Sequence, residues 1–185
     1  MGSPTHASAR LSRCAGALAV FLLASAPTLA DWELKSPPAS PSARYGHAMA
    51  HDPVGGGILL FGGAEANTTF LGDTWRWDGA TWIQLQPTSS PSPRGYHTMT
   101  VDVCRGRVLL FGGWGPLGAS TRSALGDTWE WTGTTWAQLF PQTSPPARWN
   151  SAMASDLRRR KTVLFGGETD ASFQTFRGSN DTWEW

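Results

Sequence analysis

Short apolar runs, each followed by a pair of glycines, recur along the chain. The runs occupy residues 58–61, 108–111 and 162–165, and the glycine pairs are Gly62 and Gly63, Gly112 and Gly113, and Gly166 and Gly167. A continuous apolar run of this length, bounded by turn residues, is typical of a strand buried on both faces. The pattern therefore predicts three buried strands that end at equivalent turns.

A second shared block follows each glycine pair, and in it tryptophan alternates with polar residues. The block reads Asp-Thr-Trp-x-Trp and begins at Asp73, Asp127 and Asp181, so that successive copies are 54 residues apart. Alternation of this kind predicts a half-buried strand. A fixed period is the signature of a repeat architecture, in which each repeat is one structural unit.

Two further strands complete each repeat. One precedes the apolar run, as at residues 47–51. The other follows a tight turn, as at residues 81–85 after Asp78 and Gly79. Asp-Gly between two strand-like runs is a strong hairpin signal. The Ser/Pro-rich stretches 86–93 and 140–147 cannot pair inside a sheet and are expected to link the units. A four-stranded repeat of about 50 residues is typical of one blade of a β-propeller.

The repeated blocks resemble the kelch repeat. The resemblance rests on the glycine pair after an apolar strand and on two aromatic residues with six residues between them, Trp75 and Trp82 and again Trp129 and Trp136. The first aromatic is usually Tyr in that family. The resemblance covers residues 32–185 and implies an all-β fold, a β-propeller built of four-stranded antiparallel kelch blades. Three blades are expected, at about residues 44–85, 94–139 and 148–185, with the ring incomplete in this chain.

The ends of the repeat do not coincide with the ends of a blade. Trp32 precedes Arg44 by twelve positions, as Trp82 precedes Arg94 and Trp136 precedes Arg148. Residues 31–35 are therefore predicted to be a lone outer strand, and the third blade stops after its third strand. Propellers typically have four to eight blades. Further blades are expected from a longer chain or from a second copy, since two copies paired by a two-fold axis would provide six.

Residues that recur in register are interpreted first as structural. The glycines are expected to allow backbone conformations that a Cβ would block, and Trp82 and Trp136 are expected to wedge between sheets. The aspartates are expected to accept backbone N–H bonds before the third strand. Arg44, Arg94 and Arg148 are expected to pair with these acids or to line the mouth of the channel. The structural set also contains Trp75, Trp129 and Trp183 and the six glycines and three aspartates named above.

Binding residues are expected where the blades differ, on the rim that carries the loops between the second and third strands. Trp114 is the strongest candidate, because the other two loops have no Trp counterpart. Aromatic faces interspersed with arginine suit a carbohydrate or a protein ligand, and a merely solvated rim is the alternative. The candidates are Trp114, Trp149, Tyr45, Tyr96, His47, His97, Arg122 and Arg177.

The composition and the N-terminal residues limit which partners and which cellular compartment we expect. The formal net charge of +1 does not provide the basic surface that is typical of nucleic-acid-binding proteins. Residues 1–30 have basic residues, then the apolar run 17–24 and small residues, which is the pattern of a signal peptide cleaved after Ala26 or Ala30. The protein is therefore expected to be secreted or periplasmic, without stable membrane insertion after cleavage. An uncleaved anchor is the alternative, although the run is shorter than the roughly 20 residues that span a bilayer.

Signals for catalysis are sparse. Relatives of the galactose oxidase kind hold copper with His and Tyr and carry a Tyr–Cys crosslink, but Tyr45, Tyr96 and Cys104 do not lie in a matching motif. We expect no metal and no cofactor. The basic run 158–161 is expected to be a solvated hairpin tip or a site for an anionic partner. The sequence thus predicts a secreted, non-catalytic kelch scaffold that binds protein or carbohydrate. The alternative is the N-terminal part of a secreted propeller enzyme, galactose oxidase-like or sialic-acid-processing, with catalytic residues beyond residue 185.

Overall fold

The computed structural model describes residues 31–65, 69–117, 121–169 and 177–185. The chain divides into one unit of residues 1–35 and a second unit of residues 36–185. The predicted signal peptide, residues 1–30, lies outside the described residues and stays a prediction. The described part of the second unit consists of strands and turns without a helix.

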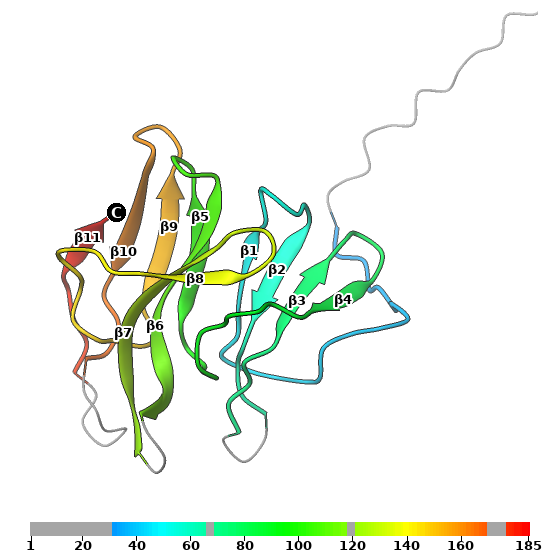
Figure 1. Cartoon of the computed structure of the whole chain (residues 1–185), viewed down its shortest axis with the longest axis horizontal. Helices are drawn as coiled ribbons and strands as arrows, with labels where there is room; N and C mark the ends of the chain where they lie inside the picture. The colour runs from blue at the N-terminus through cyan, green and yellow to red at the C-terminus, as the bar shows by residue number, and fades with distance from the viewer. Residues whose placement is uncertain (1–30, 66–68, 118–120, 170–176) are drawn as a thin grey trace, which may run out of the picture. The chain divides into compact units, whose positions relative to one another are not determined.

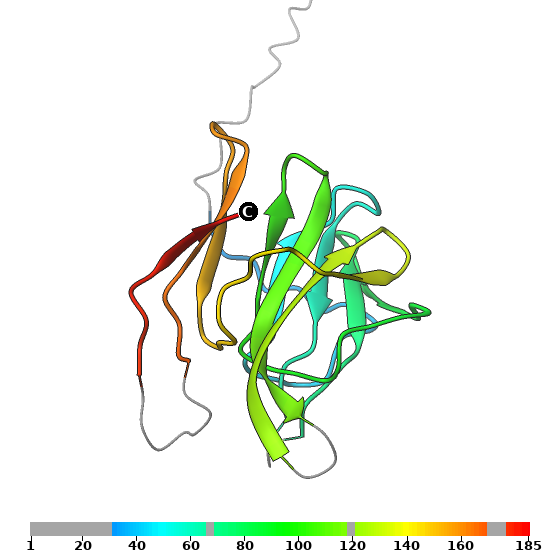
Figure 2. The ribbon, with the colours of Figure 1, turned by 60° about the vertical axis from the view of Figure 1, so that its left-hand side comes forward.

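Three antiparallel sheets make up the described residues of the second unit, in agreement with the all-β fold expected from the repeats (Figure 1). Each sheet falls inside one of the three predicted blade ranges, and we name the sheets blades 1, 2 and 3. Blade 1 contains β1 (Ala48–His51), β2 (Ile58–Phe61), β3 (Thr74–Trp77) and β4 (Trp82–Leu85). Blade 2 contains β5 (Thr98–Asp102), β6 (Arg107–Leu117), β7 (Thr121–Trp131) and β8 (Trp136–Leu139). Blade 3 contains β9 (Ala152–Asp156), β10 (Lys161–Phe165) and β11 (Thr182–Glu184) and lies beside blade 2 (Figure 2).

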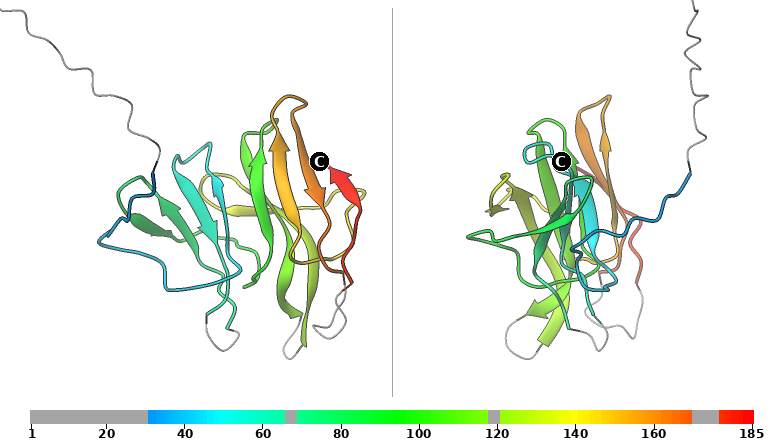
Figure 3. Two further views of the ribbon diagram at one scale, coloured as in Figure 1. Left: turned by 180° about the vertical axis from the view of Figure 1, so that it is seen from behind. Right: turned by 90° about the vertical axis from the view of Figure 1, so that its right-hand side faces the viewer.

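The strands of each blade follow one another in a meander, so that the connecting turns alternate between two rims. The hairpins β1–β2, β5–β6 and β9–β10 turn at one rim, and β2, β6 and β10 run from there toward the opposite rim (Figures 1 and 3). The turn between β3 and β4 follows from Asp78, whose side chain accepts hydrogen bonds from the backbone N–H groups of Ala80 and Thr81, both at 2.8 Å. Gly79 supplies the positive φ of 104° that this turn requires.

Two details differ from the sequence prediction. In blade 2 the ladder between β6 and β7 continues past a bulge at Phe111–Gly113, so that Trp114 pairs with Ala124 in a strand and not in a loop. Residues 31–35, predicted as a lone outer strand, do not form a strand. A strand needs an adjacent sheet edge for its backbone hydrogen bonds, and the outer position of blade 1 is already taken by β4.

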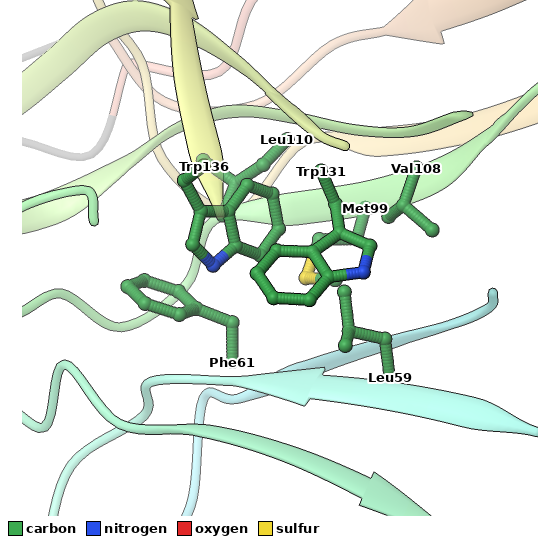
Figure 4. Packing of buried hydrophobic residues seen from close by; sticks show 7 residues of the cluster. All are labelled: Leu59, Phe61, Met99, Val108, Leu110, Trp131 and Trp136. Carbon is green, nitrogen blue, oxygen red and sulfur yellow. The ribbon is translucent and has the colours of Figure 1, made fainter. Parts of the chain in front are cut away.

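The core of the second unit lies between blades 1 and 2 (Figure 4). Leu59 and Phe61 of blade 1 face a set of apolar side chains from blade 2. Trp136 wedges between the sheets as predicted, with its ring centroid 5.4 Å from that of Phe61 and 5.4 Å from that of Trp131. The blade 2 side of the cluster consists of Met99, Val108, Leu110, Trp131 and Trp136.

Candidate functional site

The recurring arginines and aspartates form one clasp in each blade. In blade 2, Arg94 donates from Nη1 and Nη2 to the two carboxylate oxygens of Asp127, at 2.6 and 2.8 Å. Arg94 also donates to the carbonyl oxygen of Gly112 at 3.0 Å, and the indole of Trp129 donates to Asp127 at 2.7 Å. The same contacts join Arg44 to Asp73 and Arg148 to Asp181. Of the two expectations for the arginines, pairing with the acids is therefore the one that holds.

The aspartates accept their main hydrogen bonds from side chains, whereas we expected backbone donors. Burial raises the pKa of Asp127, but hydrogen bonds from Arg94 and Trp129 and the charge of Arg94 outweigh burial and leave this pKa below its ordinary value. The carboxylate is therefore ionised at neutral pH and neutralises a guanidinium that is almost completely buried. These residues hold the blade together.

The glycine pairs fix the contact between one blade and the next. All six glycines have positive φ values, as expected from the sequence. The N–H of Gly63 donates to the carbonyl of Arg94 at 2.8 Å, and that of Gly113 donates to the carbonyl of Arg148 at 2.9 Å. A Cβ on Gly112 would lie 2.5 Å from the Arg148 carbonyl oxygen, which is closer than real Cβ contacts. The glycines thus supply both the turn and the close approach.

Four aromatic side chains form a continuous row on the rim opposite the β1–β2 hairpin. We call Tyr45, Tyr96, Trp149 and Trp114 the aromatic row. Ring centroids are 6.1 Å apart for Tyr45 and Tyr96, 5.6 Å for Tyr96 and Trp149, and 5.7 Å for Trp149 and Trp114. The row crosses all three blades, since Tyr45 precedes β1, Tyr96 precedes β5 and Trp149 precedes β9. The fold thus brings together four of the eight residues predicted to bind a ligand.

The row is buried at one end and exposed at the other. Trp114 and Trp149 are only 3% and 4% exposed, so their ring faces are covered by the cluster that they form with Ala124. In this structure they support the rim and do not offer a stacking surface, which corrects the role expected for Trp114. Tyr45 is 44% exposed, and Tyr96 is partly exposed beside it. Direct ligand contact therefore stays a prediction for the two tyrosines.

The histidines and arginines that were predicted to bind a ligand also divide into buried and exposed side chains. His97 is buried, with its ring centroid 5.5 Å from that of Phe61, and neither ring nitrogen has a hydrogen-bond partner. Burial and the charge of Arg94 lower the pKa of His97 to about 3, so the ring is neutral at physiological pH and its role is packing. His47, Arg122 and Arg177 are exposed. The Arg122 guanidinium lies 5.3 Å from the ring centroid of Phe70, which packs against the aromatic row.

Tyr96 has a backbone conformation that most side chains avoid. Its φ is +57°, in the left-handed region. The residues at the same position of blades 1 and 3 are Gly46 and Asn150, with φ values of 63° and 59°, and these are the two residue types that adopt this conformation most readily. Tyr96 N–H donates to the Gly46 carbonyl, and Asn150 N–H donates to the Tyr96 carbonyl. Blade-to-blade hydrogen bonding thus holds Tyr96 in a strained state, which the alignment of the repeats made detectable.

The described residues contain no cluster of three or more His, Cys, Asp or Glu side chains arranged to hold a metal ion. Within the same residues, no helix is long and apolar enough to cross a membrane. Cys104 is an exposed free thiol in the β5–β6 turn.

Antiparallel blades of three or four strands, in which the Asp-Thr-Trp blocks recur every 54 residues, define a β-propeller of the kelch class together with the glycine pairs and the tryptophans between blades. The family model of the KLHDC2/KLHL20/DRC7 Kelch-repeats domain matches residues 22–185, and the chain belongs to this kelch-repeat family. The solved structure of YjhT is similar, with a TM-score of 0.57 and 17% sequence identity over 77% of this chain and 43% of that chain. This chain therefore spans less than half the length of that structure. No match was found among the curated proteins compared.

Proposed function

We propose that this kelch domain is a non-catalytic scaffold that binds a protein ligand at the exposed end of the aromatic row. Kelch repeat domains typically bind proteins. The observation that carries the proposal is the pair Tyr45 and Tyr96, because an exposed ring lies 6.1 Å from a ring whose backbone is held at φ +57°. Strained backbone of this kind clusters at functional sites.

The chemistry of the exposed end favours a particular kind of ligand segment. The two tyrosines offer ring surface and hydroxyl groups, a combination enriched at binding interfaces. Arg122 is exposed on β7 of blade 2, and its guanidinium lies near the ring of Phe70 in blade 1. We infer that the ligand presents an apolar side chain to the tyrosines and a carboxylate to Arg122. Carbohydrate is the competing ligand class, because sugars also stack on aromatic rings.

Selection from a random peptide library displayed on phage tests this proposal, with a glycan array run in parallel. Peptides enriched on the wild-type protein are counter-screened on Tyr96→Gly and Tyr96→Asn, which introduce the residues that blades 1 and 3 carry at this position. Both residues tolerate the backbone conformation, so the fold is retained and only the ring is lost. Peptides that lose binding to both variants support the proposal. Peptides that bind them unchanged, or ligands found on the glycan array alone, contradict it.

Export is a separate part of the proposal and rests on residues 1–30. If the signal peptide is cleaved as the sequence suggests, mass spectrometry of the protein recovered from the medium or periplasm will find Pro27 or Asp31 at the N-terminus. Recovery of the protein only inside the cell, with residues 1–30 retained, contradicts export.

A further inference from the structure

The hairpin between β9 and β10 carries four basic residues in a row. They are Arg158, Arg159, Arg160 and Lys161, and all four are exposed. We call residues 157–161 the basic tip. It lies on the rim where the hairpins β1–β2 and β5–β6 also turn, opposite the rim of the aromatic row (Figures 1 and 3). The sequence left open whether this run is merely solvated or binds an anionic partner.

One of the four basic residues, Arg159, has a role in the fold. Its guanidinium donates from Nε to the carboxylate of Asp156 at 2.6 Å and from Nη1 to the carboxylate of Glu184. Blade 2 repeats the second contact, because Arg105 has the same position in its hairpin and pairs with Glu130 at 2.9 Å. A contact that recurs from blade to blade is explained by the packing that the blades share. Arg159 therefore holds the turn.

The other three basic side chains have no such role. Among the described residues, no side-chain hydrogen bond or ion pair involves Arg158, Arg160 or Lys161. The hairpins of blades 2 and 3 pair in the same register, so the counterparts of these residues are Cys104, Gly106 and Arg107. The guanidinium of Arg107 donates to the carbonyl of Thr132 at 2.6 Å. The basic tip thus presents three positive charges without a partner in the described part of the chain.

Arg160 stands where the other two blades have glycine. Its φ is +55°, and those of Gly106 and Gly56 are 61° and 72°. Both glycine N–H groups bond the carbonyl of the aspartate that begins the turn, at 2.8 and 3.0 Å, which identifies the position as equivalent. A Cβ added to either glycine meets nothing within 4 Å, so a side chain here gains no packing. Arginine therefore costs stability relative to glycine, and strained backbone of this kind clusters at functional sites.

The basic tip is a surface of the rim whichever blade lies beside it. Blade 2 lies between blades 1 and 3 (Figure 1), and yet Cys104 and Arg105 in its hairpin turn are exposed. The thiol of Cys104 donates to the backbone carbonyl of Arg160 at 3.0 Å. Contact between neighbouring turns thus uses the backbone of Arg160 and leaves its side chain in solvent.

The distribution of charge on this rim favours a short acidic ligand. Residues 53–57, in the equivalent turn of blade 1, include no charged residue, and the arginines of the blade 2 turn are engaged by Glu130 and Thr132. The unpaired charge is therefore confined to one hairpin. Nucleic acids and bilayers present phosphates over longer distances and are bound by basic residues spread over a face. Carboxylates match the planar donor pairs of arginine and the point charge of lysine.

We propose that the basic tip is a second interaction surface, which binds an acidic segment of a protein partner through Arg158, Arg160 and Lys161. Arg159 keeps the turn in place, and the left-handed backbone at Arg160 adds a charge where the repeat provides glycine. The surface is on the rim opposite the aromatic row, so its ligand binds independently of a ligand at Tyr45 and Tyr96.

Fluorescence anisotropy with fluorescein-labelled hexaglutamate tests this proposal, with labelled hexaglutamine as the uncharged probe and low ionic strength to limit screening. We expect the wild type to bind hexaglutamate alone. Arg160→Gly should bind it about threefold more weakly, and Arg158→Gln/Arg160→Gly about tenfold, because each exposed charge pair contributes modestly. Lys35→Gln is the matched control. It also removes one positive charge, from an exposed lysine outside the second unit, and should bind like the wild type.

Thermal unfolding of the same proteins separates binding from folding. Arg160→Gly is expected to be at least as stable as the wild type, because blades 1 and 2 carry glycine at this position. A less stable variant would show that Arg160 serves the fold and would overturn the proposal. It is also overturned if the wild type does not bind hexaglutamate, or if the double variant binds it as well as Lys35→Gln does. Cosedimentation with vesicles of phosphatidylcholine and phosphatidylglycerol, without binding of hexaglutamate, would assign the tip to a membrane instead.

Discussion

The guanidinium of Arg94 contacts both carboxylate oxygens of Asp127, 33 residues away in the sequence, and also bonds the carbonyl of Gly112 at the bulge of β6. One side chain thus ties the entry of the blade, the glycine pair and the start of the third strand. Because the guanidinium is almost completely buried, its contribution to stability depends on all of these partners.

Replacing this guanidinium tests the clasp. We expect Arg94→Lys to lower the free energy of unfolding by about 3 kcal/mol, because an ammonium cannot make the planar two-point contact. Urea denaturation followed by tryptophan fluorescence measures the change. Arg105→Lys is the control, since the Arg105 side chain is 44% exposed in its pair with Glu130, and this change is expected to alter stability by less than about 0.5 kcal/mol. Equal losses in the two variants would contradict the structural role of the clasp.

Two threonine substitutions at equivalent blade junctions are expected to have opposite effects. The buried hydroxyl of Thr162 has no hydrogen-bond partner, and its counterpart in blade 2 is Val108. Thr162→Val should therefore stabilise the fold by about 1 kcal/mol. Thr74→Val removes the acceptor of the Trp136 indole and should destabilise it by about 1–3 kcal/mol. Urea midpoints that shift in the same direction would contradict this account.

The glycine pairs can be tested by separating conformational cost from steric clash. Gly79 and Gly112 both have positive φ values, but an added Cβ meets nothing within 4 Å at Gly79 and a carbonyl oxygen at 2.5 Å at Gly112. Gly79→Ala should cost about 1–2 kcal/mol from the backbone alone, and Gly112→Ala at least twice as much. The two free energies of unfolding come from thermal or urea denaturation, and equal costs would mean that close approach between blades is unimportant.

The pH dependence of stability should reveal His97. Its pKa is lowered from 6.5 to about 3 in the folded state, so protons bind the unfolded chain more readily. The stability is complete above pH 6.5 and falls as the pH decreases below that value. Between pH 7 and pH 4.5 the expected loss is about 2–3 kcal/mol. Asp73 and Asp127 have pKa values lowered from 3.8, and their contribution is lost only below about pH 4.

Urea denaturation at these two pH values measures the effect, and His97→Ser provides the comparison because blade 3 carries Ser151 at this position. The variant should be less stable overall but should lose most of the pH dependence in this window. A small slope remains, since the pKa of His47 is also lowered by burial and by Arg44. An unchanged slope in the variant would contradict the assignment to His97.

Residues that recur in every repeat made most of the fold predictable. The features that could not be predicted depend on segments that differ between the repeats. The spacing of Trp82 and Trp136 predicted an inter-blade wedge, because every blade has the same packing problem, and Trp136 occupies that place between blades 1 and 2, whereas the ring contact of Trp82 is with Trp77 of its own blade. The site was harder to predict. Trp114 falls in a segment of variable length between the glycine pair and the third strand, and no pattern there indicated that the β6–β7 ladder would continue and bury it. Tyr96 was detectable by its Gly and Asn counterparts, but its strain became evident only with the backbone geometry.

The central claim, that Tyr45 and Tyr96 form the contact surface for a protein ligand, is tested most directly by titrating one library-selected peptide against the wild type and Tyr96→Gly. Isothermal titration calorimetry gives the dissociation constants, and urea denaturation confirms that both proteins are folded. Loss of one buried aromatic contact at an interface is worth about 1–3 kcal/mol. We therefore predict that the dissociation constant of Tyr96→Gly is at least tenfold larger than that of the wild type. Equal affinity in two folded proteins would contradict the claim.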